Sequence, residues 1–245
     1  WAPPRFAHVP VVLGTDGQKL SKRRGAHNVL EYGELGYLPS AIVNAMALLG
    51  WSPGTGEEVF SLDELRELFT VERIHPSPAT FDPKRLDDLN GIHIRRMSIE
   101  DLVEALEHFL PGTSKDMRRQ LAPMLQHRMV TLADAQVLAA PLLHDVVLDE
   151  TAPLPPPKVT RDVAAAMLSG AIDIVERGGL ADHDAMLEQL RAIAKEHGAK
   201  VGDAFRTLYV AMLGTQSGVP VIEAMQYLGA ETSLIRLRRA LALLR

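Results

Sequence analysis

The chain has 245 residues, of which 47% are hydrophobic and 23% are charged, and its formal net charge is −5. This length and composition predict a globular protein with a buried core, in one large domain or in two to three smaller ones. The absence of cysteine excludes disulfides and thiolate metal sites, and no apolar run approaches the roughly 18 residues of a membrane span, so we expect a cytoplasmic protein without membrane partners.

The first predicted element is a short strand in HVPVVLG, residues 8–14, followed by an Asp-Gly turn at residues 16–17 and a strongly basic loop. The first 28 residues carry a net charge of +4 and leave −9 for the rest of the chain. Such a local cluster favours one anionic ligand at one place, because lysine side chains on a glycine-flanked loop can follow phosphate oxygens. A solvated hairpin tip without a ligand is the alternative that composition leaves open.

Two helices are predicted next, over residues 37–50 and 61–69, from apolar residues at helical spacing. In the second helix Ser61 and Glu64 have the spacing of a capping box. The segment 75–83 contains three prolines and is expected to be irregular.

A short helix is expected near residues 84–90, and the chain beyond Arg96 consists of eight segments with apolar stripes of period near 3.6. These stripes predict an almost entirely helical second half. A stiff proline-rich linker at residues 151–158 is expected to separate two helical subdomains. The predicted fold class is therefore mainly α, with a small α/β portion at the start.

The basic loop contains Lys19-Leu20-Ser21-Lys22-Arg23, which is similar to the KMSKS signature of class I aminoacyl-tRNA synthetases, in the form of bacterial-type glutamyl-tRNA synthetases. Three segments resemble consecutive stretches of that family in the family's order: PRFAHVPVVLGTDGQKLSKRRGA, YLPSAIVNAMALLGWS and HPSPATFDPKRLDDLNGIHIR. The resemblance implies the end of a class I Rossmann-like catalytic fold at residues 1–30 and a stem-contact region at residues 31–96. It further implies two helical anticodon-binding subdomains, at residues 97–152 and 153–245.

The resemblance also implies glutamate–tRNA ligase chemistry in two steps. ATP activates L-glutamate to glutamyl-adenylate, and the glutamyl group then passes to the 3′ end of tRNA(Glu) in protein biosynthesis. In the family the second lysine of the signature, Lys22 here, contacts the ATP phosphates and stabilises the pyrophosphate leaving group. The candidate catalytic residues are thus Lys22, Lys19 and Ser21, and the candidate nucleotide-binding residues are Lys19, Leu20, Ser21, Lys22, Arg23 and His8.

Seven arginines, in the basic loop and on predicted helices, are candidate contacts to tRNA phosphates, and a solvated helix face is the alternative for them. They are Arg24, Arg95, Arg96, Arg118, Arg119, Arg236 and Arg239. None of the nine histidines pairs at metal-ligand spacing, and no dense carboxylate cluster suggests a cation cage, so we predict no bound metal. Mg²⁺ is expected to arrive with ATP.

The sequence contains no HIGH-type signature, which class I synthetases place on the amino-terminal side of the KMSKS-type loop. We therefore expect that this chain alone does not aminoacylate tRNA and that L-glutamate is bound mainly by residues outside it. A monomer is expected, with ATP and tRNA(Glu) as partners. The missing signature leaves open a tRNA-binding module without catalysis, and the helical half leaves open a scaffold that binds only protein.

Overall fold

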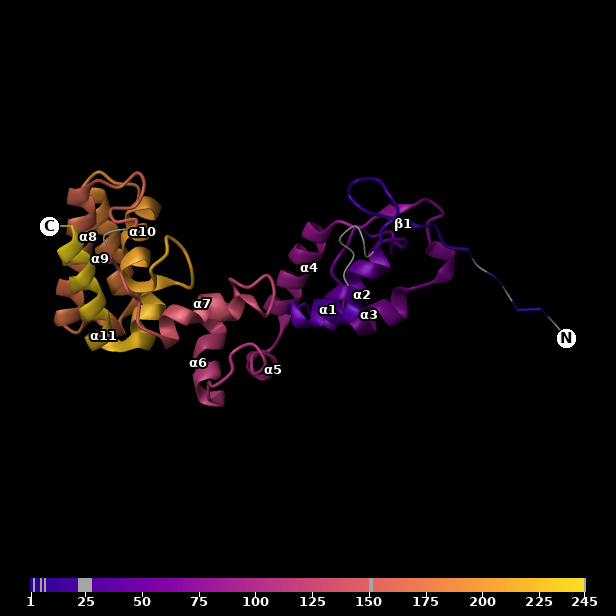
Figure 1. Cartoon of the computed structure of the whole chain (residues 1–245), viewed down its shortest axis with the longest axis horizontal. Coiled ribbons are helices and arrows are strands. Elements are labelled where there is room, and N and C mark those ends of the chain that lie inside the picture. Colours follow the sequence, from indigo (N-terminus) through magenta and orange to yellow (C-terminus); the bar gives the residue numbers. More distant parts are fainter. Residues whose placement is uncertain (2, 5, 7, 22–27, 150–151, 245) are drawn as a thin grey trace. The chain divides into compact units, whose positions relative to one another are not determined.

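The computed structural model of the chain describes residues 1, 3–4, 6, 8–21, 28–149 and 152–244. The chain is organised in two compact units, and their α-helices and β1 are labelled in Figure 1. Unit 1 comprises residues 1–118 and 129–135, and unit 2 comprises residues 119–128 and 136–245. Helices dominate both units, which confirms the mainly α fold class. The division into four parts at residues 30, 96 and 152 stays a prediction.

Unit 1 is built from short helices and two very short strands. Local signals set several helix starts: Pro39 is the first residue of α2, and Ser61 and Glu64 form the predicted capping box of α3. In chain order the elements are β1 (Val12–Leu13), α1 (Val29–Glu34), α2 (Pro39–Leu48), α3 (Leu62–Leu68), the 3-10 helix η2 (Val71–Arg73), β2 (Ala79–Thr80), α4 (Pro83–Arg96) and α5 (Ile99–Ala105).

Strands β1 and β2 pair in parallel, with Val12 opposite Ala79 and Leu13 opposite Thr80. The pairing continues past the strands, because the Phe81 amide donates to the Leu13 carbonyl over 2.8 Å. β1 lies within the strand predicted from the sequence. β2, by contrast, lies in the proline-rich segment for which an irregular structure was expected, so the base of the basic loop is held by a segment distant in the sequence.

The core of unit 1 forms where α2 packs on α4 and where three large side chains cluster beside the end of α2. Trp51, Phe60 and Leu65 make this cluster, and the rings of Trp51 and Phe60 meet edge to face with centroids 6.1 Å apart. Helix α4 extends beyond the predicted short helix to Arg96, because His93 and Ile94 continue its buried face.

Residues 129–135 return to unit 1 and pack on the turn between α1 and α2. The Leu132 amide donates to the Gly36 carbonyl over 2.9 Å. The buried side chain of Asn90 accepts from the Leu38 amide over 2.8 Å and donates to the Val130 carbonyl over 2.5 Å. These backbone contacts hold the returning segment in one register.

Unit 2 is a helical bundle centred on α8, which contacts α9, α10 and α11. Met167, Leu168 and Ala171 give α8 a fully buried face. Helices α6 (Lys115–Gln126) and α7 (Asp134–Leu143) each begin in unit 1 and continue into unit 2. The remaining elements are α8 (Arg161–Glu176), the 3-10 helix η3 (Gly179–Ala181), α9 (His183–Glu196), α10 (Val201–Leu213) and α11 (Val221–Leu243).

The last helix, α11, is interrupted at Gly229, whose backbone angles are φ 80° and ψ 168°. That region of conformational space is essentially restricted to glycine. The two helical segments that the sequence predicts on either side of this residue therefore run into one another through a kink.

Candidate functional site

The basic loop leaves β1 through a tight hairpin turn. The Gly14 amide donates to the Gln18 carbonyl over 2.8 Å, and the Gln18 amide donates to the Asp16 carboxylate over 3.0 Å. Gly17 has a φ of 73°, which an L-residue rarely adopts and glycine adopts freely. The Asp-Gly signal in the sequence thus predicts the turn that the structure shows.

Beyond the turn, the first residues of the KMSKS-like signature run back along β1. Lys19 forms an antiparallel bridge with Leu13, and the Leu20 amide donates to the Val12 carbonyl over 2.9 Å. Leu20 is half-buried, whereas Lys19 and Ser21 are exposed. The backbone of the signature is therefore fixed at its start, while two of its polar side chains are accessible to a ligand.

The other predicted residues of the nucleotide site are placed only in part. Lys22, Arg23 and Arg24 lie outside the described residues, so their contacts stay predictions. His8 is exposed and lies on the segment that leads into β1. Among the described residues, the structure therefore brings Lys19, Leu20 and Ser21 to one hairpin.

An apolar cavity of about 240 Å³ lies beside β1 and β2 in unit 1. Val12, Ala79, Trp51 and Phe69 are among its lining residues, and the lining is almost wholly apolar. Phosphate oxygens that lose water in such a lining would find few hydrogen-bond donors to replace it. The cavity is therefore unsuited to the phosphates of a nucleotide.

Arg95 and Arg96 lie in the last turn of α4, and both are exposed. Cationic side chains there interact favourably with the negative end of the helix dipole. Arg96 also donates to the Val59 carbonyl over 3.3 Å. Both arginines are thus accessible to a phosphate group while their charge already stabilises the helix end.

His93, on the same helix, belongs to a buried polar network that sequence reasoning missed. Its Nε2 lies 3.0 Å from Oδ1 of Asn44. The Asn44 amide nitrogen donates to the Glu58 carbonyl over 3.0 Å, and Oδ1 also accepts from the Phe60 amide over 2.9 Å. Since Oδ1 is the acceptor, Nε2 of His93 carries the proton. Burial lowers the pKa of His93, and the nearby Arg96 lowers it further.

The depressed pKa of His93 predicts a pH-dependent stability. The unfolded state binds the proton with the ordinary pKa of about 6.5 and the folded state resists it, so this contribution is complete above pH 6.5 and is lost as the pH falls towards the lower folded pKa. We expect the free energy of unfolding to fall more steeply from about pH 7 to 5 in the native chain than in His93→Gln. Urea denaturation at stepped pH measures this, and equal slopes would contradict it.

Arg118 does not fit the expectation of an exposed phosphate contact. Its side chain is 5% exposed, and it donates to the Val103 carbonyl over 3.0 Å and to the Thr113 carbonyl over 2.8 Å. Its Nη2 atom lies 3.6 Å from the Glu107 carboxylate. The side chain thus ties α5 to the start of α6. The adjacent Arg119 is exposed.

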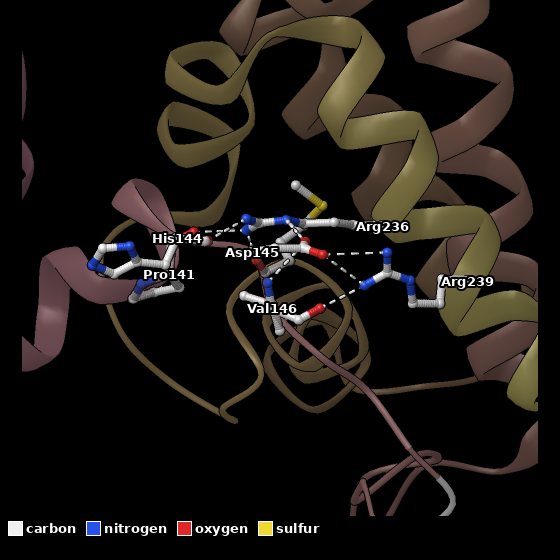
Figure 2. A network of polar contacts seen from close by, with 7 residues as sticks. Pro141, His144, Asp145, Val146, Arg236 and Arg239 are labelled. Carbon is white, nitrogen blue, oxygen red and sulfur yellow. Dashed lines mark hydrogen bonds and ion pairs between the residues drawn. The ribbon is translucent and has the colours of Figure 1, made fainter.

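Arg236 and Arg239 project from α11 towards the residues that follow α7, as Figure 2 shows. Arg236 is 3% exposed and donates to three backbone carbonyls. Arg239 is half-buried and donates to the Val146 carbonyl over 2.7 Å. Burial corrects the interpretation of Arg236 as a tRNA contact, and no pattern in the sequence distinguishes this arginine from those on a solvated face.

Among the described residues, no group of three or more His, Cys, Asp or Glu side chains could hold a metal ion. In the same part of the chain, no helix is both long enough and apolar enough to cross a membrane.

Two protein families match this sequence, one to its first part and one to its second. The family described as "tRNA synthetases class I (E and Q), catalytic domain" matches residues 1–88, and the family described as "Anticodon binding domain" matches residues 101–241. The hairpin and both strands lie in the first matched region, and helices α6 to α10 lie in the second.

Named relatives agree with these families. The chain is 37% identical over 255 residues to a glutamate–tRNA ligase of Roseiflexus castenholzii, covering 100% of the chain and 50% of the relative. It is also 37% identical to a glutamate–tRNA ligase of Acidothermus cellulolyticus, covering 99% of the chain and 51% of the relative. A solved glutamate tRNA ligase from Elizabethkingia meningosepticum, in complex with its amino acid, has a TM-score of 0.79 at 23% identity, over 100% of this chain and 53% of that one.

The chain thus spans about half the length of the curated relatives that it matches. The catalytic-domain match comes first along the chain and the anticodon-binding match follows it. This is the order that the family resemblance implies. Over residues 101–241 the chain belongs to the anticodon-binding domain family, and its first 88 residues match the class I (E and Q) synthetase catalytic family.

Proposed function

We propose that the whole protein is a glutamate–tRNA ligase, which activates L-glutamate with ATP and transfers it to tRNA(Glu). The observation that carries this proposal is the Lys19–Arg23 signature, whose first residue is bridged to β1, inside the region matched by the class I catalytic family. We further propose that the protein acts as a cytoplasmic monomer and that L-glutamate is bound mainly by residues outside this chain.

In the proposed reaction the basic loop acts on the phosphates of ATP. Lys22 supplies a positive charge where negative charge develops on the pyrophosphate leaving group, and Mg²⁺ accompanies the nucleotide. Lys19 and Ser21 contribute a second cation and a hydroxyl donor, and the exposure of both supports this role. The half-buried Leu20 anchors the backbone between them. Arg23 and His8 are proposed as further nucleotide contacts.

For tRNA we propose contacts from the arginines that remain accessible. Arg95, Arg96 and Arg119 are exposed, and Arg24 stays a candidate from the sequence. Arg239 is half-buried and engaged within the chain, so it contributes less to this surface. A tRNA-binding module without catalysis is not favoured, because the chain matches a catalytic family and its relatives are named as ligases.

Salt-dependent binding of tRNA(Glu) by the 245-residue chain tests the RNA-binding part of this proposal. Each phosphate that the protein neutralises adds roughly 0.7 to 0.9 to the slope of log affinity against log salt. We expect the double variant Arg95→Gln, Arg96→Gln to bind more weakly and to lower this slope by about 0.7 to 0.9 for each phosphate that it no longer neutralises. Filter binding at several salt concentrations measures both quantities.

Arg191→Gln is the matched control, because Arg191 is an exposed arginine of α9 that pairs with Glu188 and lies outside the proposed contact set. Its affinity and slope should equal those of the native chain. A slope that the double variant leaves unchanged would remove Arg95 and Arg96 from the proposed surface, and binding that is insensitive to salt would contradict phosphate recognition altogether.

A further inference from the structure

The carboxyl end of α7 is attached to the core of unit 2 through one buried guanidinium. Nη1 of Arg236 donates to the carbonyls of Pro141 and Met212 over 2.7 Å and 2.6 Å, and Nη2 donates to the carbonyl of His144 over 2.8 Å. Figure 2 shows this side chain extending from α11 to the residues around His144. The three carbonyls belong to two separate stretches of chain.

Two of these carbonyls lie where helices end. Pro141 is near the end of α7 and Met212 is near the end of α10, and the last four carbonyls of a helix lack partners within it. The same ends carry the negative pole of the helix dipole. Arg236 therefore caps the carboxyl ends of two helices at once, and its hydrogen bonds offset the cost of burying a charge.

The neighbouring carboxylate adds a second attachment. Nη1 and Nη2 of Arg239, one turn further along α11, lie 3.3 Å and 3.4 Å from Oδ2 of Asp145. Oδ1 of Asp145 is 3.8 Å from Nε of Arg236, a nitrogen with no hydrogen-bond partner among the described residues. Burial lowers the pKa of Arg236 while Asp145 opposes that shift, and a guanidinium stays charged at neutral pH.

Apolar packing contributes little to this attachment after residue 143. The side chains of His144 and Asp145 are exposed, Val146 is half-buried and Val147 is 81% exposed. Leu142 is the last fully buried apolar residue of the helix end. The polar contacts from α11 therefore position residues 144–146 together with the bond from the His144 amide to the Ala140 carbonyl.

We propose that Arg236, Arg239 and Asp145 form a clasp that joins the end of α7 to α10 and α11, so that residues 141–146 open only when the core of unit 2 opens. The clasp gives the two arginines a role inside the protein that their spacing on a helix did not predict. Within the region matched by the anticodon-binding family, it makes the end of α7 and the two last helices one cooperative body.

Hydrogen exchange of the whole 245-residue chain, read by mass spectrometry, tests the clasp. In the native chain, the amides of residues 142–144, which donate within the end of α7, should exchange no faster than the slow amides of α10. Arg236→Met keeps the side-chain length and removes the donors, so we expect these amides to exchange about tenfold faster or more, relative to α8 and α10.

The matched control is Arg238→Met, because Arg238 is exposed on the same helix and pairs with Glu176 across 2.6 Å. Exposed ion pairs contribute little to stability, so in Arg238→Met the exchange rates of the same amides should change less than about twofold. Should Arg236→Met fail to fold, Arg239→Gln removes only the outer attachment and should raise exchange at residues 144–146 alone. Fast exchange of residues 142–144 in the native chain, or a uniform rise throughout unit 2 in the variants, would overturn the clasp.

Discussion

Gly36→Ala is expected to destabilise unit 1 by roughly 2 to 5 kcal/mol, the sum of backbone strain and overpacking. Gly36 has a φ of 85°, and a Cβ atom there would lie 2.5 Å from the Ala133 nitrogen and 2.8 Å from the Leu132 nitrogen. Both atoms are backbone, so no side-chain rotation relieves the overlap. The Leu132 amide also donates to the Gly36 carbonyl over 2.9 Å, and a shift that makes room for the methyl group disturbs this bond.

Gly33→Ala provides a matched control three positions away. Gly33 lies inside α1, and a Cβ atom there would have no neighbouring atom within 4 Å. This substitution should be neutral or should stabilise the chain by about 0.5 to 1 kcal/mol, because alanine is the better helix former. Urea denaturation followed by tryptophan fluorescence measures both variants, since Trp51 is buried in unit 1 while Trp1 is exposed. Equal stability of Gly36→Ala and the native chain would show that residues 129–135 do not pack as described.

The features that the sequence predicts well are those set by neighbouring residues. Ser61 and Glu64 cap α3 across three positions, Pro39 begins α2 with a backbone angle that proline already favours, and the Asp16-Gly17 pair turns the chain after β1. Each signal acts within one helical turn or one hairpin. Helix starts and the hairpin turn were therefore predictable without knowledge of the rest of the molecule.

Features that depend on distant partners were not predictable in the same way. β2 exists because two residues of a proline-rich segment meet β1, and no local preference marks them as a strand. Arg118 and Arg236 are buried because carbonyl groups left without helical partners face them. In the sequence, both look like arginines on a solvent-exposed helix face.

For the candidate nucleotide site, the sequence predicted the residues but not which of their side chains are exposed. The signature at Lys19–Arg23 predicted the chemistry only together with the three segments that resemble the same family, because five residues alone are not specific. The structure adds that Lys19 is paired to Leu13 and that Ser21 is exposed, which separates the fixed start of the signature from its accessible side chains. The hairpin therefore fixes the backbone of Lys19 and Leu20 against β1.

Lys22→Ala in the full-length enzyme is expected to lower the rate of ATP–pyrophosphate exchange by about 10² to 10³-fold. Removal of a preorganised group that stabilises developing charge commonly costs roughly 3 to 4 kcal/mol of transition-state stabilisation. The charge in question develops on the pyrophosphate as the bond to the α-phosphorus breaks. Exchange of labelled pyrophosphate into ATP, with L-glutamate and tRNA(Glu) present, measures the loss directly.

Two comparisons separate this role from a general effect of charge. Lys84→Ala removes an exposed lysine at the start of α4, outside the signature, and should leave the exchange rate unchanged. The affinity of Lys22→Ala for tRNA(Glu) should stay close to the native value, because the proposed contacts of Lys22 are to ATP and not to RNA. An exchange rate within about threefold of native, a loss of under 1 kcal/mol, would show that Lys22 does not stabilise the leaving group. A parallel loss of tRNA binding would instead place Lys22 on the RNA surface.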